Sequence, residues 1–227
     1  MFFDDNKMKE GNSSYFPGQR PHMEDFLANA AKHFWYTGLR QEQIHDAIRT
    51  ACDFFGIPMP QLVYDITNNP NEGTGVFKRM RDTYEDDILQ YNMKELVRLG
   101  VTNLDAFTLV LTHECMHRVL QRTTLPGRNN GAWEEELACD YFMGVRAAMT
   151  GMDEDPVARG LLSTEGWYTH PDGSLRYTFI KQGKQNAYFD LIRRRPVSFQ
   201  VMYQQFLELL AKHREEIDRL QKPFFPA

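Results

Sequence analysis

The chain has 227 residues, 42% of them hydrophobic and 13% aromatic, which is enough to bury a full core within one domain. Its formal net charge of −5 arises from mixed charges without a broad basic face, so nucleic acid is not expected as a partner. The start of the chain lacks the pattern of a signal peptide, and no apolar run reaches the roughly 18 residues of a membrane span, so we expect a cytoplasmic protein.

The first 21 residues are polar and rich in Asn, Ser, Gly and Pro, a composition that buries little surface. We therefore expect residues 1–21 to form a flexible arm and residues 22–227 to form a single domain.

Two helices and three short strands are expected next. The helices are predicted near residues 22–36 and 39–55; in the second, apolar residues repeat at helical spacing up to Phe55, and Gly56 closes the segment. Strand-like runs separated by turn residues follow at residues 61–67, 73–77 and 87–92. These runs predict a small sheet beside the helices.

Two further helices are predicted in the middle of the chain and one near its end. From a polar cap at Thr102–Asn103, apolar residues mark one helical stripe through about residue 121. After a loop-like stretch, a second helix is expected at residues 133–149. A long apolar stripe then predicts one helix over residues 198–221, in which His213 is expected to be packed or exposed rather than to bind a metal.

The three cysteines, Cys52, Cys115 and Cys139, form an odd set without a CxxC pair. This pattern suits reduced thiols better than a disulfide framework. We interpret the cysteines as small buried hydrophobic residues rather than as metal ligands.

The strongest chemical signal is the run His113-Glu114-Cys115-Met116-His117, an HExxH motif within a predicted helix. A spacing of four residues places both imidazoles on one helix face, where two ring nitrogens can reach one Zn²⁺ at about 2.0–2.1 Å. Glu114 then points beside the ion and is the expected general base. The apolar residues before the motif predict a buried helix, in which a merely solvated His-Glu-His face is not expected.

A catalytic zinc site needs a third protein ligand and an open fourth position. A third histidine six residues after His117 would fall on Thr123, so the metzincin pattern HExxHxxGxxH is absent. The next predicted helix instead carries three acidic candidates for the third ligand, Glu134, Glu135 and Glu136.

The segment Glu136-Leu-Ala-Cys-Asp140 resembles the ExxxD motif of the gluzincins, the HExxH peptidases whose third ligand is a Glu on a second helix. The resemblance implies that His113, His117 and Glu136 bind Zn²⁺ and that Asp140 accepts a hydrogen bond from a ligand imidazole. The spacing after His117 is close to that of thermolysin-like enzymes. The small residues before Asp140 are similar to the ExxAD motif of prenyl-processing membrane peptidases, with Cys139 in the place of Ala.

A later segment, Trp167-Tyr-Thr-His-Pro-Asp-Gly-Ser-Leu-Arg176, resembles the His-Pro and Arg region of the same prenyl-processing peptidases. The resemblance implies that His170 donates a hydrogen bond to the oxyanion of the tetrahedral intermediate and that Arg176 supports the site. A Pro-Asp-Gly turn with an exposed histidine is the competing interpretation. Tyr168 is a second candidate for the oxyanion role.

These patterns together predict a mostly helical, zincin-like α+β domain with a small mixed sheet beside the HExxH helix. The predicted activity is that of a zinc metalloendopeptidase of the gluzincin type acting on a protein or peptide substrate. Glu114 would take a proton from the attacking water and return it to the leaving amine, and the substrate would lie along the edge strand near residues 87–92. Two alternatives stay open: a zinc-stabilised binding or regulatory module without catalysis, and a zinc hydrolase of non-peptide amides.

Overall fold

The computed structural model describes residues 39–60, 62–65, 75–79, 87–91, 96–97, 99–122 and 132–224. The predicted arm at residues 1–21 and the predicted helix at residues 22–36 lie outside the described residues.

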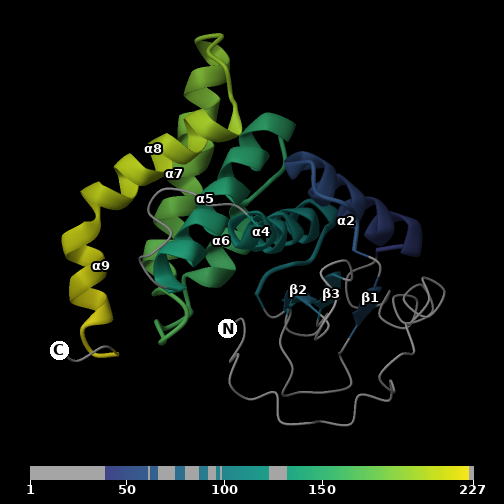
Figure 1. Ribbon diagram of the computed structural model, residues 1–227, viewed down its shortest axis with the longest axis horizontal. Coiled ribbons are helices and arrows are strands. Elements are labelled where there is room, and N and C mark those ends of the chain that lie inside the picture. Colours follow the sequence, from purple (N-terminus) through teal and green to yellow (C-terminus); the bar gives the residue numbers. More distant parts are fainter. Residues whose placement is uncertain are drawn as a thin grey trace.

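Seven helices form the body of the described chain (Figure 1). In chain order they are α2 (Gln41–Phe55), α4 (Leu104–Arg122), α5 (Ala132–Thr150), α6 (Asp155–Leu161), α7 (Gly173–Ile192), α8 (Phe199–Lys212) and α9 (Arg214–Gln221). None of these helices combines the length and the apolar composition that crossing a bilayer requires.

Local sequence signals set the ends of several helices. Gly56 adopts a left-handed conformation with φ of 63° and ends α2. At the start of α4 the side chain of Asn103 accepts a hydrogen bond of 2.9 Å from the backbone N–H of Ala106. Asp172 and Ser198 cap α7 and α8 in the same way. The helices predicted at residues 39–55, 102–121 and 133–149 are confirmed as α2, α4 and α5.

The end of the chain departs from the prediction. The single helix predicted over residues 198–221 is wrong, because the chain turns at His213 and forms α8 and α9. The sequence pattern predicts no element where α6 and α7 lie.

Three short strands pair in one sheet, in the order β1-β3-β2. They are β1 (Leu62–Asp65), β2 (Gly75–Arg79) and β3 (Asp87–Tyr91), with β1 parallel and β2 antiparallel to β3.

Of the residues whose side chains are described, 73% lie in helices and none lies in a strand, so the predicted α+β fold class is wrong and the described body is helical. Strands of four or five residues span about 17 Å at most. They cannot cover helices of 19 and 20 residues, which are about 28–30 Å long.

The buried apolar side chains form two clusters. One lies mainly between α2, α4 and α6 and includes Ile48, Phe107 and Leu161. The other lies mainly between α5, α7 and α8 and includes Phe142 and Phe206. Helices α4 and α5 contribute to both clusters, so the polar residues of these two helices lie between two packed apolar clusters.

Two glycines let α5 and α7 approach each other closely. A Cβ at Gly144 would lie 1.9 Å from the carbonyl oxygen of Ile180, and one at Gly183 would lie 2.1 Å from the carbonyl oxygen of Tyr141. Side chains larger than hydrogen therefore cannot be placed at either position without moving backbone. This close approach brings Asp140 of α5 beside α7.

All three cysteines are buried and free, as predicted. The Sγ atoms of Cys52 in α2 and Cys115 in α4 lie 4.0 Å apart, so both pack at the contact between these helices.

Candidate metal centre

The HExxH motif lies in the second half of α4, and its three polar residues, His113, Glu114 and His117, are buried. Helix α4 is buried on most of its surface because it packs against α2 on one side and α5 on another. The apolar residues before the motif, including Phe107 and Leu111, are likewise buried. This confirms the prediction that the motif stands on a buried helix.

Three residues direct donor atoms at one point between α4 and α5. The Nε2 atoms of His113 and His117 lie 3.2 Å apart. The carboxylate of Glu136 places Oε2 3.3 Å from Nε2 of His113 and Oε1 3.2 Å from Nε2 of His117. Ligands at 2.0–2.1 Å from a tetrahedral zinc ion are separated by about 3.3 Å. The two Nε2 atoms and the carboxylate oxygen nearest each of them therefore stand at separations close to those of ligands around such an ion.

Cys139 lies close to the same point. One donor atom each of His113, His117 and Cys139 lies within 4.8 Å of the others, so these three buried residues form a group that could bind a metal ion. The carboxylate oxygens of Glu136 lie 3.2–3.3 Å from the Nε2 atoms of the two histidines, well within this distance. Burial raises the pKa of the Cys139 thiol, whereas a bound metal ion would lower it.

A buried carboxylate and guanidinium hold the ring of His113. Oδ1 of Asp140 lies 2.9 Å from Nδ1 of His113, and Arg176 donates two hydrogen bonds to Asp140, from Nε at 2.7 Å and from Nη2 at 2.9 Å. Burial favours the protonated acid, but Arg176 and His113 together hold the pKa of Asp140 below its ordinary value. Asp140 is thus a charged partner that orients the imidazole.

Glu135 holds the ring of His117 in the corresponding way. Its Oε1 lies 2.8 Å from Nδ1 of His117, and its side chain is 34% exposed. From the sequence, Glu135 is only a competitor for the place of the third ligand. Its contact with His117 was missed because it depends on how α5 crosses α4, which no spacing within one helix encodes.

His170 lies at the edge of this cluster. Its Nε2 is 3.6 Å from Oε1 of Glu136, and its Nδ1 is 2.7 Å from Oγ1 of Thr169. The interpretation of His170 as an exposed turn residue is wrong, because its side chain is buried. Burial lowers the pKa of His170 to about 4, so the ring is neutral at pH 7. The facing carboxylate favours the proton on Nε2, and the Thr169 hydroxyl then donates to Nδ1.

The turn before α7 places His170. The backbone N–H of Trp167 donates to the carbonyl of His170 at 2.8 Å, and the indole N–H of Trp133 in α5 donates to the carbonyl of Trp167 at 2.7 Å. The segment is thereby tied to the helix that carries Glu136. Tyr168, the other predicted candidate for the oxyanion role, is half exposed and packs on the rings of Trp167 and Phe224.

Glu114 is a buried carboxyl group beside the ligand residues. Neither of its carboxylate oxygens has a hydrogen-bond partner among the described residues, although a buried carboxyl is costly without one. Burial raises its pKa, and His113, His117 and Arg176 are near enough to oppose that rise. The two Nε2 atoms that face each other fit a site for a cation. The unpartnered carboxyl of Glu114 fits a reacting molecule beside it.

Comparisons of the chain with protein-family models, with curated proteins and with solved structures found no match. The structure gathers the predicted residues His113, His117, Glu136, Asp140, His170 and Arg176 in one cluster, with Glu114 beside it.

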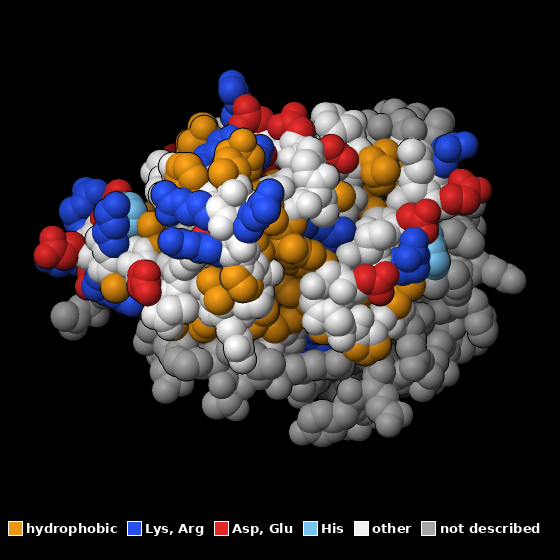
Figure 2. All heavy atoms as spheres, turned by 90° about the horizontal axis from the view of Figure 1, so that it is seen from above, with side chains coloured by type: hydrophobic (Ala, Val, Ile, Leu, Met, Phe, Trp, Pro, Cys, Tyr) orange, Lys and Arg blue, Asp and Glu red, His pale blue; other side chains and the backbone are white. Residues whose placement is uncertain are grey.

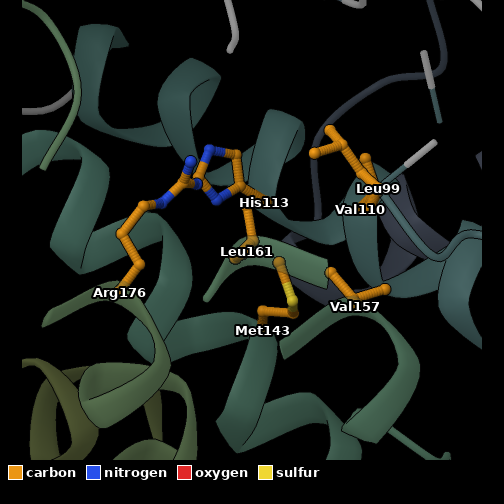
Figure 3. Close-up of a pocket in the computed structure, with 7 residues that line it drawn as sticks. All are labelled: Leu99, Val110, His113, Met143, Val157, Leu161 and Arg176. Carbon is orange, nitrogen blue, oxygen red and sulfur yellow. The ribbon is translucent and has the colours of Figure 1, made fainter. Parts of the chain in front are cut away.

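A small cavity of about 10 Å³ lies behind His113 and Arg176 (Figure 3). The remaining lining is apolar and comes from Leu99, Val110, Met143, Val157 and Leu161. This volume corresponds to about one water molecule, so the cavity is too small for a substrate side chain.

Proposed function

We propose that this protein is a zinc-dependent metallopeptidase of the gluzincin type, with His113, His117 and Glu136 as the metal ligands. The observation that carries the proposal is the set of separations of 3.2–3.3 Å among the two Nε2 atoms and the Glu136 oxygens. Two imidazoles and one carboxylate form a donor set typical of catalytic zinc, and three protein ligands leave a fourth position for the reaction.

A zinc ion held by these residues would supply Lewis acidity, which polarises a carbonyl group and makes water easier to deprotonate near neutral pH. The proposed work of the chain itself is to move protons and to stabilise charge. Glu114 accepts the proton of the attacking water and returns it to the leaving amine. His170, neutral and protonated on Nε2, donates a hydrogen bond to the oxygen that becomes negative as the carbonyl carbon turns tetrahedral.

Three further residues keep the ligands in place. Asp140 and Glu135 each hold the Nδ1 side of one histidine, which directs the Nε2 lone pairs toward the common centre. Arg176 keeps Asp140 ionised and lies 3.6 Å from Oε2 of Glu136. The proposed endopeptidase activity thus depends on a rigid pair of helices, α4 and α5, closed by the N-terminal turn of α7.

Substitution Glu114→Gln tests the proposed activity. It keeps the size of the side chain but removes the basic group, so cleavage of a quenched fluorescent peptide library should fall by about 10²–10⁴-fold, with the zinc content unchanged. The matched control is Glu134→Gln, because Glu134 is also buried in α5 but pairs with Arg214 of α9. Unchanged peptide cleavage by Glu114→Gln would overturn the proposal. A wild-type protein that binds zinc and cleaves no peptide would instead favour a binding module or a hydrolase of other amides.

A further inference from the structure

The corner at which α7 meets α8 projects beyond the other described helices (Figure 1). It comprises residues 188–201, from the last turn of α7 to the first turn of α8. The corner is remote from the metal centre, because Arg176 stands in the first turn of α7 and Ile192 ends the same helix.

Large apolar side chains are exposed on this corner. Ile192 is 60% exposed and Tyr188 is 55% exposed, and Phe189, Leu191 and Val201 are exposed as well. Single exposed apolar residues are ordinary, but several on one protrusion mark a contact surface. These residues gather where α7 ends.

Three consecutive arginines, Arg193, Arg194 and Arg195, adjoin the apolar side chains, and all three are exposed. The acidic residue of the corner, Asp190, is buried, accepts a hydrogen bond from Gln205 and lies 3.9 Å from Arg195. The guanidinium of Arg193 lies over the ring of Phe189, 5.7 Å from its centroid. Figure 2, which looks onto the molecule from above, shows basic and hydrophobic side chains side by side there.

The charge of the corner is opposite to that of the chain. The whole chain carries a formal net charge of −5, whereas the exposed charges of residues 188–201 are three arginines. The corner is therefore a local cationic site on an acidic protein, and its complement is an anionic surface.

We infer that the corner of α7 and α8 binds the surface of an anionic lipid bilayer. A convex protrusion needs a soft partner into which apolar side chains can enter, and the headgroup region supplies one. Arginine side chains beside Ile192 and Leu191 can remain at the level of anionic headgroups while the apolar groups enter below them. Nucleic acid would use the arginines but would leave the exposed aliphatic side chains in water.

Binding in this way sets the orientation of the chain. Helix α7 rises about 1.5 Å per residue, so Arg176 stands about 24 Å along the helix axis from Ile192. The metal centre would then stand at the far end of α7 from the bilayer surface. This inference concerns a different surface from the proposed peptidase site and does not depend on it.

Co-sedimentation of the full chain with lipid vesicles tests the inference. Vesicles of phosphatidylcholine containing phosphatidylserine should bind the protein at low salt, and vesicles of phosphatidylcholine alone should bind it far less. The double variant Arg193→Gln/Arg194→Gln should weaken binding about 25-fold, at about fivefold for each arginine. Ile192→Ser should weaken it about tenfold. Arg49→Gln, which removes an exposed arginine of α2 that pairs with Asp46 and Asp53, should bind as the wild type does.

Three results would overturn the inference: absence of sedimentation with both kinds of vesicle, equal binding to both, or unchanged binding by the double arginine variant. Binding of a polyglutamate peptide without vesicle binding would assign the corner to an acidic protein partner instead. The substituted side chains are exposed, so circular dichroism should show wild-type folding in every variant.

Discussion

The two ends of α7 place arginines in opposite environments. At the N-terminal end, Arg176 is 1% exposed and donates two hydrogen bonds to Asp140, which is fully buried. At the C-terminal end, Arg193 and Arg194 are exposed beside Ile192. A buried charge persists only where a partner compensates its lost hydration, whereas an exposed charge is stable without one. The arginine at the buried end therefore fixes the position of Asp140, and the arginines at the exposed end are accessible to another surface.

The largest expected effect comes from breaking the buried pair. Arg176→Met leaves the Asp140 carboxylate buried without its cationic partner, so the free energy of unfolding should fall by about 3–5 kcal/mol. Arg193→Met at the other end of α7 should change it by less than about 0.5 kcal/mol. Urea unfolding of both variants measures the difference. Equal losses of stability in the two variants would contradict the different roles of the arginines at the two ends of α7.

A smaller effect is expected where α5 and α7 touch in the middle. Gly144→Ala places a Cβ against the carbonyl oxygen of Ile180, so the helices must separate, at a cost of about 1–3 kcal/mol. Thermal unfolding should show the loss, and retention of zinc against a chelator should also weaken because Arg176 moves away from Asp140. The part-buried Ala148→Ser in the same helix is the control. Wild-type stability of Gly144→Ala would contradict the close approach of the helices.

The neighbouring residues Glu134 and Glu135 give a sharper test of the buried end. Glu135→Gln weakens the hold on Nδ1 of His117 and should lower zinc affinity about 10–100-fold, which is about 1.4–2.7 kcal/mol. Glu134→Gln removes the negative charge that pairs with Arg214 of α9 and should leave zinc affinity unchanged. Competition with a zinc-binding dye measures both affinities. Equal zinc affinities in the two variants would contradict a role for Glu135 in positioning His117.

The smallest expected effect concerns the middle of α7. Burial favours protonation of Glu154, but Lys181 and Lys184 donate hydrogen bonds to it and hold its pKa below the ordinary value. Its stabilisation is therefore complete above the unfolded pKa of about 4.3 and is lost as the pH falls through the lower, folded pKa. Glu154→Gln should reduce stability at pH 7 by about 1 kcal/mol or less and should flatten the loss in acid. Thermal unfolding between pH 7 and pH 3 measures both, and an unchanged acid profile would contradict this account.

Local helical periodicity explains what the sequence could predict of the site. Four-residue spacing placed His113 with His117 and Glu136 with Asp140 on helix faces, and the structure brings these two faces together. The contact of Glu135 with His117 and that of Trp133 with Trp167 arise only when separate elements meet. Such contacts carry no periodic signal along the chain.

The fold was predicted less completely, for a related reason. The buried face of α7 contains Arg176, Gly183 and Asp190 besides apolar residues, whereas Leu191 and Ile192 of the same helix are exposed. A helix buried in this manner lacks the single apolar stripe that marks an amphipathic helix. Near the end of the chain, the apolar stripe predicts too long a helix. The stripe continues past His213, although α8 ends and α9 begins there.

The most direct test of the central claim is the metal content of Glu136→Ala and Cys139→Ala, measured by elemental analysis beside the wild type. We expect one zinc ion per wild-type chain, a large loss in Glu136→Ala and full retention in Cys139→Ala. Cobalt-substituted protein should show no sulfur-to-metal charge-transfer absorption. Zinc retained by Glu136→Ala and lost by Cys139→Ala, or a wild-type chain that binds no zinc, would contradict that claim.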